Sequence, residues 1–239
     1  MNSTCRRDFT ELLLEKFNFF GMRPDLVAPT AEGVANIYCL KHRNYHTGDR
    51  IASMLEHAKV LGWKSELLTA AVIGHNLWWY PDYRVTDLCT ISAKVARSIF
   101  SETAIINRPV GDGNFGMKMG TDLVCDAIES SAYAYGWTMN KVKLSGLGAK
   151  LIDLCLADLA DPIDEFIAKR EAMCTERRQN DDWRVLEKAF SKHASELADL
   201  LEHRGDSLFL TDEGKEAFHS NAVKSINEFY SRYGSQTKA

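Results

Sequence analysis

The chain has 239 residues, of which 45% are hydrophobic and 26% charged, a balance typical of globular proteins with a sizeable core. The net charge of −4 at pH 7 gives no basic excess and argues against a nucleic-acid-binding surface. The start of the chain lacks the apolar segment of a secretory signal, and no stretch of about 20 apolar residues could cross a membrane. The six cysteines are scattered without a CxxC pair, so we expect reduced core thiols in a cytoplasmic protein.

Helical spacing of apolar residues recurs along the chain, and only five prolines interrupt it. Gly62 is expected to end one helix, and the next is predicted over 65–79, with His75 on its apolar face. Further helices are predicted over 149–159, 181–203 and 211–230, with Asp182 and Thr211 at the starts of the last two. No stretch alternates as a strand would. The sequence therefore predicts one all-α domain, 1–239, of about eight to ten helices.

Residues 107–120, NRPVGDGNFGMKMG, form the one glycine-rich stretch, and we predict a surface loop there. The glycine spacing resembles a nucleotide-binding loop, but it follows no predicted strand and lacks the P-loop lysine pattern. A flap over a pocket is the alternative interpretation.

Three polar residues stand where apolar ones are expected. His46 is expected to begin a helix, His75 lies on an apolar helix face, and Asp158 interrupts an apolar stripe. Each histidine alone fits a core residue that is hydrogen-bonded to the backbone. A buried acid is harder to explain in this way, because leaving it unpaired is costly.

Basic and aromatic residues accompany these three. Arg43, His46 and Arg50 follow one another at spacings of three and four, which would place them on one helix face. The predicted pocket therefore contains Arg43, His46, Arg50, His75, Asn76 and Asp158, with Trp78, Trp79 and Tyr80 around it. Such a pocket is cationic on one side and suits an anionic ligand, for example a phosphate ester.

The stretches YCLKHRNYHTGDRIASML and AAVIGHNLWWYPDY resemble the predicted metal-dependent phosphohydrolases of the HD superfamily. The residues that match three successive family blocks are Tyr38, Arg43, Tyr45 and His46, then Ala70, Ala71, His75 and Tyr80, then Asp87, Ser92 and Ala93. LIDLCLADLADP resembles the block with the last metal-binding aspartate, here Asp158, and EGKEAFHSNAVKSINEF resembles the C-terminal helix. The resemblance covers nearly the whole chain and implies an HD-domain-like helical bundle with the site inside it.

The chain departs from this family at the metal ligands. Arg50 stands where the resemblance implies a metal-binding histidine, and Asn76 where it implies the bridging aspartate. Further departures are Leu88 and Cys89 in place of an Asn–Glu pair, and Tyr133 and Tyr135 near an expected histidine. A guanidinium has no lone pair to donate, and an amide carries no charge. Only His75 and Asp158 remain of the four principal ligands, which is too few to hold a catalytic metal.

Two hypotheses follow. In the first, the site has lost its metal and binds a nucleotide-like ligand, another phosphate or a protein partner without hydrolysis and without a cofactor. Arg50 then pairs with Asp158 or with a bound anion, and the ligand-binding residues are Arg43, Arg50, Asn76, Trp78 and Tyr80.

In the second hypothesis, the chain is an active phosphohydrolase that uses Mn, Mg or Co on a nucleotide or phosphate monoester. His75 and Asp158 would hold the metal, Asp82 or Asp87 would replace lost ligands, and His46 would act as the general acid. Metal-free acid–base chemistry by His46, His75 and Asp158 is a third possibility.

Overall fold

The fold is almost entirely helical, which confirms the predicted all-α class for the part of the chain that the structure describes. The structure is a computed structural model that describes residues 3–80, 83–112, 116–134, 144–178 and 183–234. Ten α-helices run in the order α1 (Ser3–Phe19), α2 (Pro24–Tyr38), α3 (Gly48–Val60), α4 (Glu66–Gly74), α5 (Val85–Phe100), α6 (Gly120–Ser130), α7 (Gly146–Leu156), α8 (Ile163–Arg178), α9 (Trp183–Arg204) and α10 (Asp212–Tyr233). Short 3-10 helices η1 (Ser131–Tyr133), η3 (Ala157–Ala160) and η4 (Gly205–Ser207) follow α6, α7 and α9.

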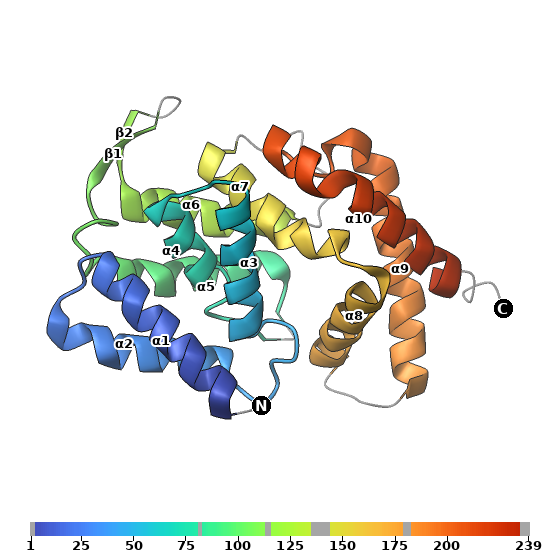
Figure 1. Cartoon of the computed structure of the whole chain (residues 1–239), viewed down its shortest axis with the longest axis horizontal. Helices are drawn as coiled ribbons and strands as arrows, with labels where there is room; N and C mark the ends of the chain where they lie inside the picture. The colour runs from blue at the N-terminus through green and yellow to red at the C-terminus, as the bar shows by residue number, and fades with distance from the viewer. Residues whose placement is uncertain (1–2, 81–82, 113–115, 135–143, 179–182, 235–239) are drawn as a thin grey trace.

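The stretch 107–120, which we predicted to be a loop, contains a short antiparallel hairpin, so that prediction is wrong. Its strands are β1 (Pro109–Asp112) and β2 (Gly116–Met119), which pair in register from Pro109 with Met119 to Asp112 with Gly116. Strands of four residues are too short to show alternation in the sequence. The two strands project at one edge of the molecule (Figure 1), and none of their described residues lines either cavity described below.

The helices gather in two groups, and the candidate site lies where they meet. Helices α1 to α6 occupy one side of Figure 1 and α8, α9 and α10 the other. Helix α7 packs on α4 and α6, while η3, which follows it, packs on α10 and α8. Buried apolar side chains from all ten α-helices belong to one contiguous cluster. The chain segment 157–160 therefore carries Asp158 from the first group into contact with the second.

Helix α4 begins as predicted and ends five residues early. Ser65 is its N-cap, and the Ser65 hydroxyl accepts a hydrogen bond from the Leu68 N–H at 3.3 Å. The helix stops at Gly74 rather than at residue 79. The guanidinium of Arg43 donates to the carbonyls of Asn76 at 2.7 Å and Leu77 at 3.3 Å. These contacts satisfy backbone acceptors beyond the helix end, so the chain can turn away there.

Other boundaries follow the sequence closely. Gly62, with a φ of +70°, ends α3 as predicted. The predicted helix 211–230 is α10, and the Thr211 hydroxyl caps it by accepting from the Gly214 N–H at 3.0 Å. The predicted helix 149–159 is α7 followed by η3. The predicted helix 181–203 is α9, but its expected cap, Asp182, lies outside the described residues.

The described cysteines agree with the prediction of reduced thiols. Cys89, Cys125, Cys155 and Cys174 are buried and free, and Cys39 is half-buried and free. The side chain of Cys5 lies outside the described part. Within the described residues, no helix is both long and apolar enough to cross a membrane.

Asp153 joins α7 to the start of α10, and its loss is expected to destabilise the fold. Its fully buried carboxylate accepts hydrogen bonds from the N–H of Leu210 at 2.7 Å, the N–H of Thr211 at 2.9 Å and the Thr211 hydroxyl at 2.6 Å. We expect Asp153→Ala to lower the free energy of unfolding by about 2–3 kcal/mol, because backbone donors lose their acceptor. Urea denaturation measures this change. Thr211→Ala is the control and should cost about 1 kcal/mol through loss of the cap. If Asp153→Ala loses no more unfolding free energy than the control, Asp153 does not join α7 to α10 as described.

Candidate functional site

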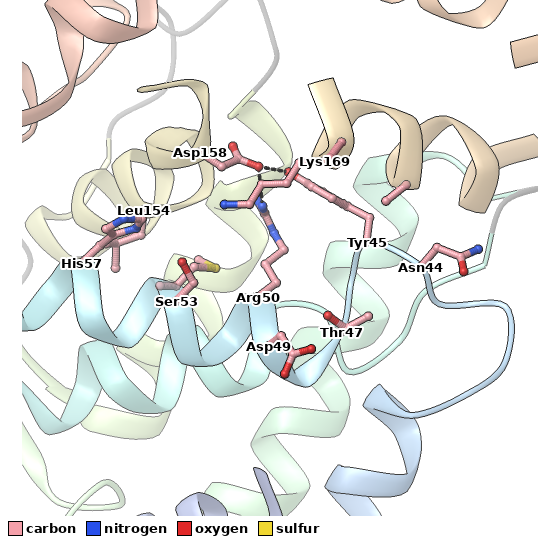
Figure 2. A pocket seen from close by; sticks show the side chains of 13 residues that line it. Asn44, Tyr45, Thr47, Asp49, Arg50, Ser53, His57, Leu154, Asp158 and Lys169 are labelled. Atoms are coloured by element: carbon pink, nitrogen blue, oxygen red, sulfur yellow. Dashed lines mark hydrogen bonds and ion pairs between the residues drawn. The ribbon is translucent and has the colours of Figure 1, made fainter. Parts of the chain in front are cut away.

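Two cavities lie on either side of the side chains of Tyr45 and Arg50, which line both. The outer cavity has a volume of about 270 Å³ and is lined mainly by Thr47, Asp49, Ser53, His57, Leu154, Asp158 and Lys169, in addition to the shared pair (Figure 2). The inner cavity has a volume of about 200 Å³, and its further lining includes His46, His75, Asn76, Trp79, Leu88, Cys89, Ser131, Cys155 and Arg177. Arg50 therefore stands in the wall between the two cavities.

Asp158 is held by three donors on one oxygen. Its Oδ2 accepts from the Tyr45 hydroxyl at 2.5 Å, from Arg50 Nη1 at 2.6 Å and from Arg170 Nη2. Burial by itself would raise the pKa of Asp158, but the positive charges of Arg170 and Arg50 outweigh it and hold the pKa well below the usual range. Arg50 also donates through Nη2 to the carbonyl of Cys155 at 2.9 Å. The sequence suggested either Asp158 or a bound anion as the partner of Arg50, and in the structure Arg50 pairs with Asp158.

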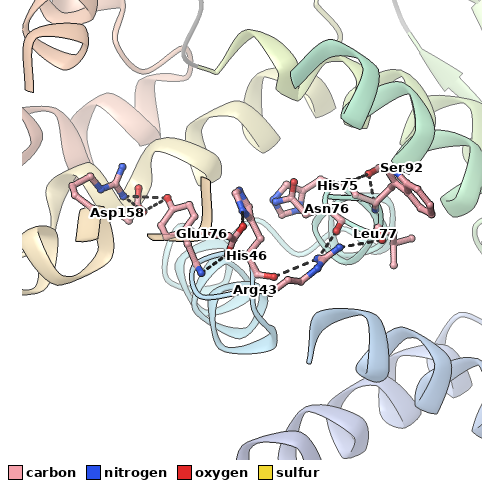
Figure 3. Close-up of polar contacts among 11 residues, drawn as sticks. Arg43, His46, His75, Asn76, Leu77, Ser92, Asp158 and Glu176 are labelled. Carbon is pink, nitrogen blue, oxygen red and sulfur yellow. Dashed lines mark hydrogen bonds and ion pairs between the residues drawn. The ribbon is translucent and has the colours of Figure 1, made fainter. Parts of the chain in front are cut away.

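His46 forms a pair with Glu176 at the edge of the inner cavity (Figure 3). Glu176 Oε1 lies 2.5 Å from His46 Nδ1, and Oε2 accepts from the N–H of Tyr45 at 2.6 Å and of His46 at 3.0 Å. The His46 ring stacks on Trp79 with ring centroids 5.0 Å apart. Burial lowers the pKa of His46 to about 4 despite the opposing hydrogen bond and charge of Glu176. The pair thus consists of a neutral imidazole and an ionised carboxylate at neutral pH.

His75 is buried, and both of its ring nitrogens have partners within the described chain. Its Nδ1 donates to the Val72 carbonyl at 2.7 Å, which leaves Nε2 as the acceptor of the ring. The side-chain amide of Asn76 lies 2.6 Å from that Nε2 and donates to it. Burial lowers the pKa of His75 to about 3, so the ring is neutral at physiological pH. The lone pair that could bind a metal is therefore occupied by the neighbouring amide.

The buried neutral state of His75 predicts a pH-dependent stability. Its pKa is lower in the folded chain than in the unfolded one, so its contribution is complete above about pH 6.5 and is lost as the pH falls towards about 3. Between pH 6.5 and pH 5 we expect the free energy of unfolding to fall by about 1.5 kcal/mol more in the wild type than in His75→Gln. Urea denaturation at both pH values measures the difference. Equal falls in the two proteins would mean that His75 is protonated in the folded state.

The structure corrects the prediction that Arg43, His46 and Arg50 share one helix face. Helix α3 starts at Gly48 with Thr47 as its N-cap, so of these three only Arg50 is helical. Arg43 is buried under the end of α4, donates to backbone carbonyls and lines neither cavity. It stabilises the chain turn after α4 and does not contribute to either cavity as the predicted ligand-binding group.

The aromatic and acidic residues of the same segment are placed as follows. Trp79 lines the inner cavity, whereas Trp78 and Tyr80 line neither cavity and are 42% and 47% exposed. Asp87 pairs with Arg84 at 3.0 Å on the surface and lies in neither cavity lining, so it does not replace a lost ligand there. Asp82 lies outside the described residues.

Three residues of the site were not predicted from the sequence, and all of them lie on α8. Arg170 contacts Asp158, Glu176 holds His46, and Arg177 lines the inner cavity. Arg170 is fully buried, and Glu176 is 1% exposed. The signal that marks Arg170 and Glu176 is their spacing from the apolar residues Phe166 and Met173, which places charged side chains on the buried face of a helix. Arg177, one residue further on, is exposed and carries no such signal.

His46 and His75 converge on the inner cavity as predicted, whereas Asp158 lies across the wall in the outer one. Among the described residues, no three or more His, Cys, Asp or Glu side chains are grouped so that they could hold a metal ion.

Comparison with known proteins identifies no relative, because no protein family, no curated protein and no solved structure matches this chain.

Proposed function

We propose that this chain is an HD-type helical protein that binds a phosphate-bearing, nucleotide-like ligand in the inner cavity and does not hydrolyse it by the metal-dependent route. One observation supports this most strongly. Both side chains that the resemblance leaves as metal ligands already have protein partners, since Asp158 Oδ2 accepts from Tyr45, Arg50 and Arg170, and His75 Nε2 accepts from Asn76.

The wall between the cavities is unfavourable for a dication. The Arg50 guanidinium lies 2.6 Å from Asp158 and lines the inner cavity beside His75. A divalent ion bound between His75 and Asp158 would lie within a few ångströms of that permanent positive charge. A single carboxylate shared with two arginines does not offset this repulsion. Arg50 therefore takes the electrostatic place of a metal ion in the proposed site.

The charge of the inner cavity suits an anion. Its lining includes the cations Arg50 and Arg177 and, within the described residues, no carboxylate. Two guanidinium groups can hold a phosphate through charge-assisted hydrogen bonds. Trp79 lines the same cavity, whereas its chain neighbours Trp78 and Tyr80 do not. The Trp79 ring supports a ligand in which a planar base accompanies the phosphate.

The placement of the family positions supports the HD-type part of the proposal. His46 and His75, which match the family, and Arg50, Asn76 and Cys89, which replace its polar residues, all line the inner cavity. These residues come from the loop before α3 and its first turn, from the two residues after α4 and from the first turns of α5. Their shared lining supports an HD-type arrangement at these positions, while Asp158, the remaining metal-ligand position of the family pattern, lines the outer cavity.

Binding is tested by a thermal-shift screen of nucleoside mono- and triphosphates, pyrophosphate and inorganic phosphate in the presence of EDTA. A ligand at 100 times its dissociation constant should stabilise the fold by about 2.7 kcal/mol. We expect at least one compound to do so and Arg177→Ala to weaken its binding by about tenfold or more, because one charge-assisted hydrogen bond is lost.

Lys169→Ala is the matched control for Arg177→Ala, because Lys169 is a cation of the outer cavity only. It should leave the affinity within about twofold of the wild type, since no contact with the phosphate changes. Equal losses in both variants would show that general charge, rather than the inner cavity, attracts the ligand. No shift with any phosphate compound would reject the proposal, and release of phosphate that requires added manganese would favour the hydrolase hypothesis.

A further inference from the structure

The His46–Glu176 pair has a geometry that the binding of phosphate alone does not require. The two residues lie on the loop before α3 and on α8, and Glu176 is fixed by two backbone N–H groups as well as by His46. An ionised carboxylate accepts but cannot donate, so its contact with Nδ1 places the proton of the neutral ring on that nitrogen. The opposite nitrogen, Nε2, is therefore the acceptor of the ring.

The acceptor edge of His46 faces the inner cavity. His46 lines that cavity and Glu176 does not, so the edge with Nδ1 is turned away from it. Figure 3 shows the same arrangement, with Glu176 on one side of His46 and the pair of His75 and Asn76 on the other. No described residue hydrogen-bonds to His46 Nε2, whereas His75 Nε2 already accepts from Asn76. The lining of the inner cavity thus includes, beside the side-chain oxygens of Asn76 and Ser131, an acceptor on a neutral ring, His46 Nε2, together with the cations Arg50 and Arg177.

We propose that the inner cavity selects a phosphate compound with a hydroxyl group near the phosphate, whose O–H donates to His46 Nε2 while Arg177 and Arg50 hold the phosphate. This inference rests on the proposed function and names the ligand class of the same site, which includes sugar phosphates and ribonucleotides. Glu176 acts as a positioning residue, because it fixes which nitrogen carries the proton. A neutral ring of low basicity accepts such a hydrogen bond without removing the proton, which favours recognition over general-base chemistry.

The test is a calorimetric comparison of glycerol 3-phosphate with propyl phosphate at pH 8 in EDTA. The two probes share the same charge and the same number of carbon atoms, and only the first has hydroxyl groups. We expect glycerol 3-phosphate to bind about tenfold more tightly, the effect of one added hydrogen bond to a buried acceptor. His46→Phe removes the acceptor and should bring the two affinities within about twofold of each other by weakening only glycerol 3-phosphate.

A second measurement tests the role of Glu176 in the wild type and does not depend on whether His46→Phe folds. Long-range proton–nitrogen spectra of protein with ¹⁵N-labelled histidine should show His46 protonated on Nδ1 and unprotonated on Nε2 from pH 6 to pH 8. In Glu176→Gln the amide can donate to Nδ1, so we expect the Nε2–H form to appear and the preference for glycerol 3-phosphate to fall below about threefold.

The possible outcomes separate the two proposals. Equal binding of both probes by the wild type, or a His46 ring protonated on Nε2, would overturn this inference and leave the proposed phosphate site intact. Failure of both probes, together with the nucleotides and inorganic phosphate, would overturn the proposed function itself. Tighter binding of glycerol 3-phosphate that survives His46→Phe would show that another group recognises the hydroxyl.

Discussion

Replacing Asp158 by alanine is expected to lower the free energy of unfolding by about 3–5 kcal/mol, the cost of breaking a buried ion pair from one side. The carboxylate is 4% exposed and accepts from Arg50, Arg170 and Tyr45. Without it, two largely buried guanidinium groups lose their negative partner, and the Tyr45 hydroxyl loses its acceptor. Urea denaturation at pH 7 measures the loss, and circular dichroism shows whether the variant still folds.

Asp122→Ala is the matched control for this effect. Asp122 also pairs with an arginine, Arg97, but both side chains are well exposed, at 39% and 52%. Such surface pairs contribute about 0–1 kcal/mol, so the control should lose no more than that. The loss of unfolding free energy in Asp158→Asn should lie between the losses in Asp158→Ala and Asp122→Ala, because the amide oxygen still accepts hydrogen bonds but carries no charge. A loss of less than about 1 kcal/mol for Asp158→Ala would show that the arginines are solvated and not held by Asp158.

Introducing the two residues that the proposed HD-type site lacks should create metal binding. In the double variant Arg50→His with Asn76→Asp, the permanent cation leaves the wall, a second imidazole enters, and His75 Nε2 is no longer occupied by an amide donor. We expect the affinity for Mn²⁺ to rise by at least about 100-fold, since even the outer partners of metal ligands change affinity by 10–100-fold. Titration of Mn²⁺ followed by electron paramagnetic resonance measures the free ion directly.

Two comparisons make the metal experiment specific. Adding His75→Ala to the double variant should remove the gain, because His75 is the imidazole that the wild type already provides. The wild type should carry no stoichiometric transition metal after purification, which elemental analysis measures. One or two ions per wild-type chain, lost in His75→Ala, would contradict the account and favour the hydrolase hypothesis. A folded double variant with unchanged Mn²⁺ affinity would count against the proposed HD-type arrangement of the site.

The regular parts of the fold were predictable because their signals are local. Ser65 and Thr211 are side-chain N-caps at the residues where helices were expected, and Gly62 ends α3 with a left-handed backbone. These features depend on a few neighbouring residues. The end of α4 was not predictable in the same way, because Arg43, which is more than 30 residues away, supplies the donors there.

The residues that line the two cavities were predictable where polar side chains interrupt apolar faces or where the family pattern marks them. His46, His75, Arg50 and Asp158 were identified, whereas Glu176 was not. The partners of Glu176 lie 130 and 131 residues away in the sequence, so no local pattern reports them. The spacing of Arg43, His46 and Arg50 was misread as helical because Thr47, an N-cap residue, marks the true start of α3. Long-range contacts, rather than propensities, decide this part of the structure.

In the proposed function, the inner cavity binds a phosphate-bearing ligand without metal. The most direct test of this binding is a calorimetric titration of the EDTA-treated protein with the best nucleotide from the thermal-shift screen, repeated with excess Mn²⁺. We predict saturable binding of one ligand per chain in EDTA, with an affinity that Mn²⁺ changes by less than about threefold, because Arg50 and Arg177 supply the positive charge. Binding that appears only with Mn²⁺ would contradict the account.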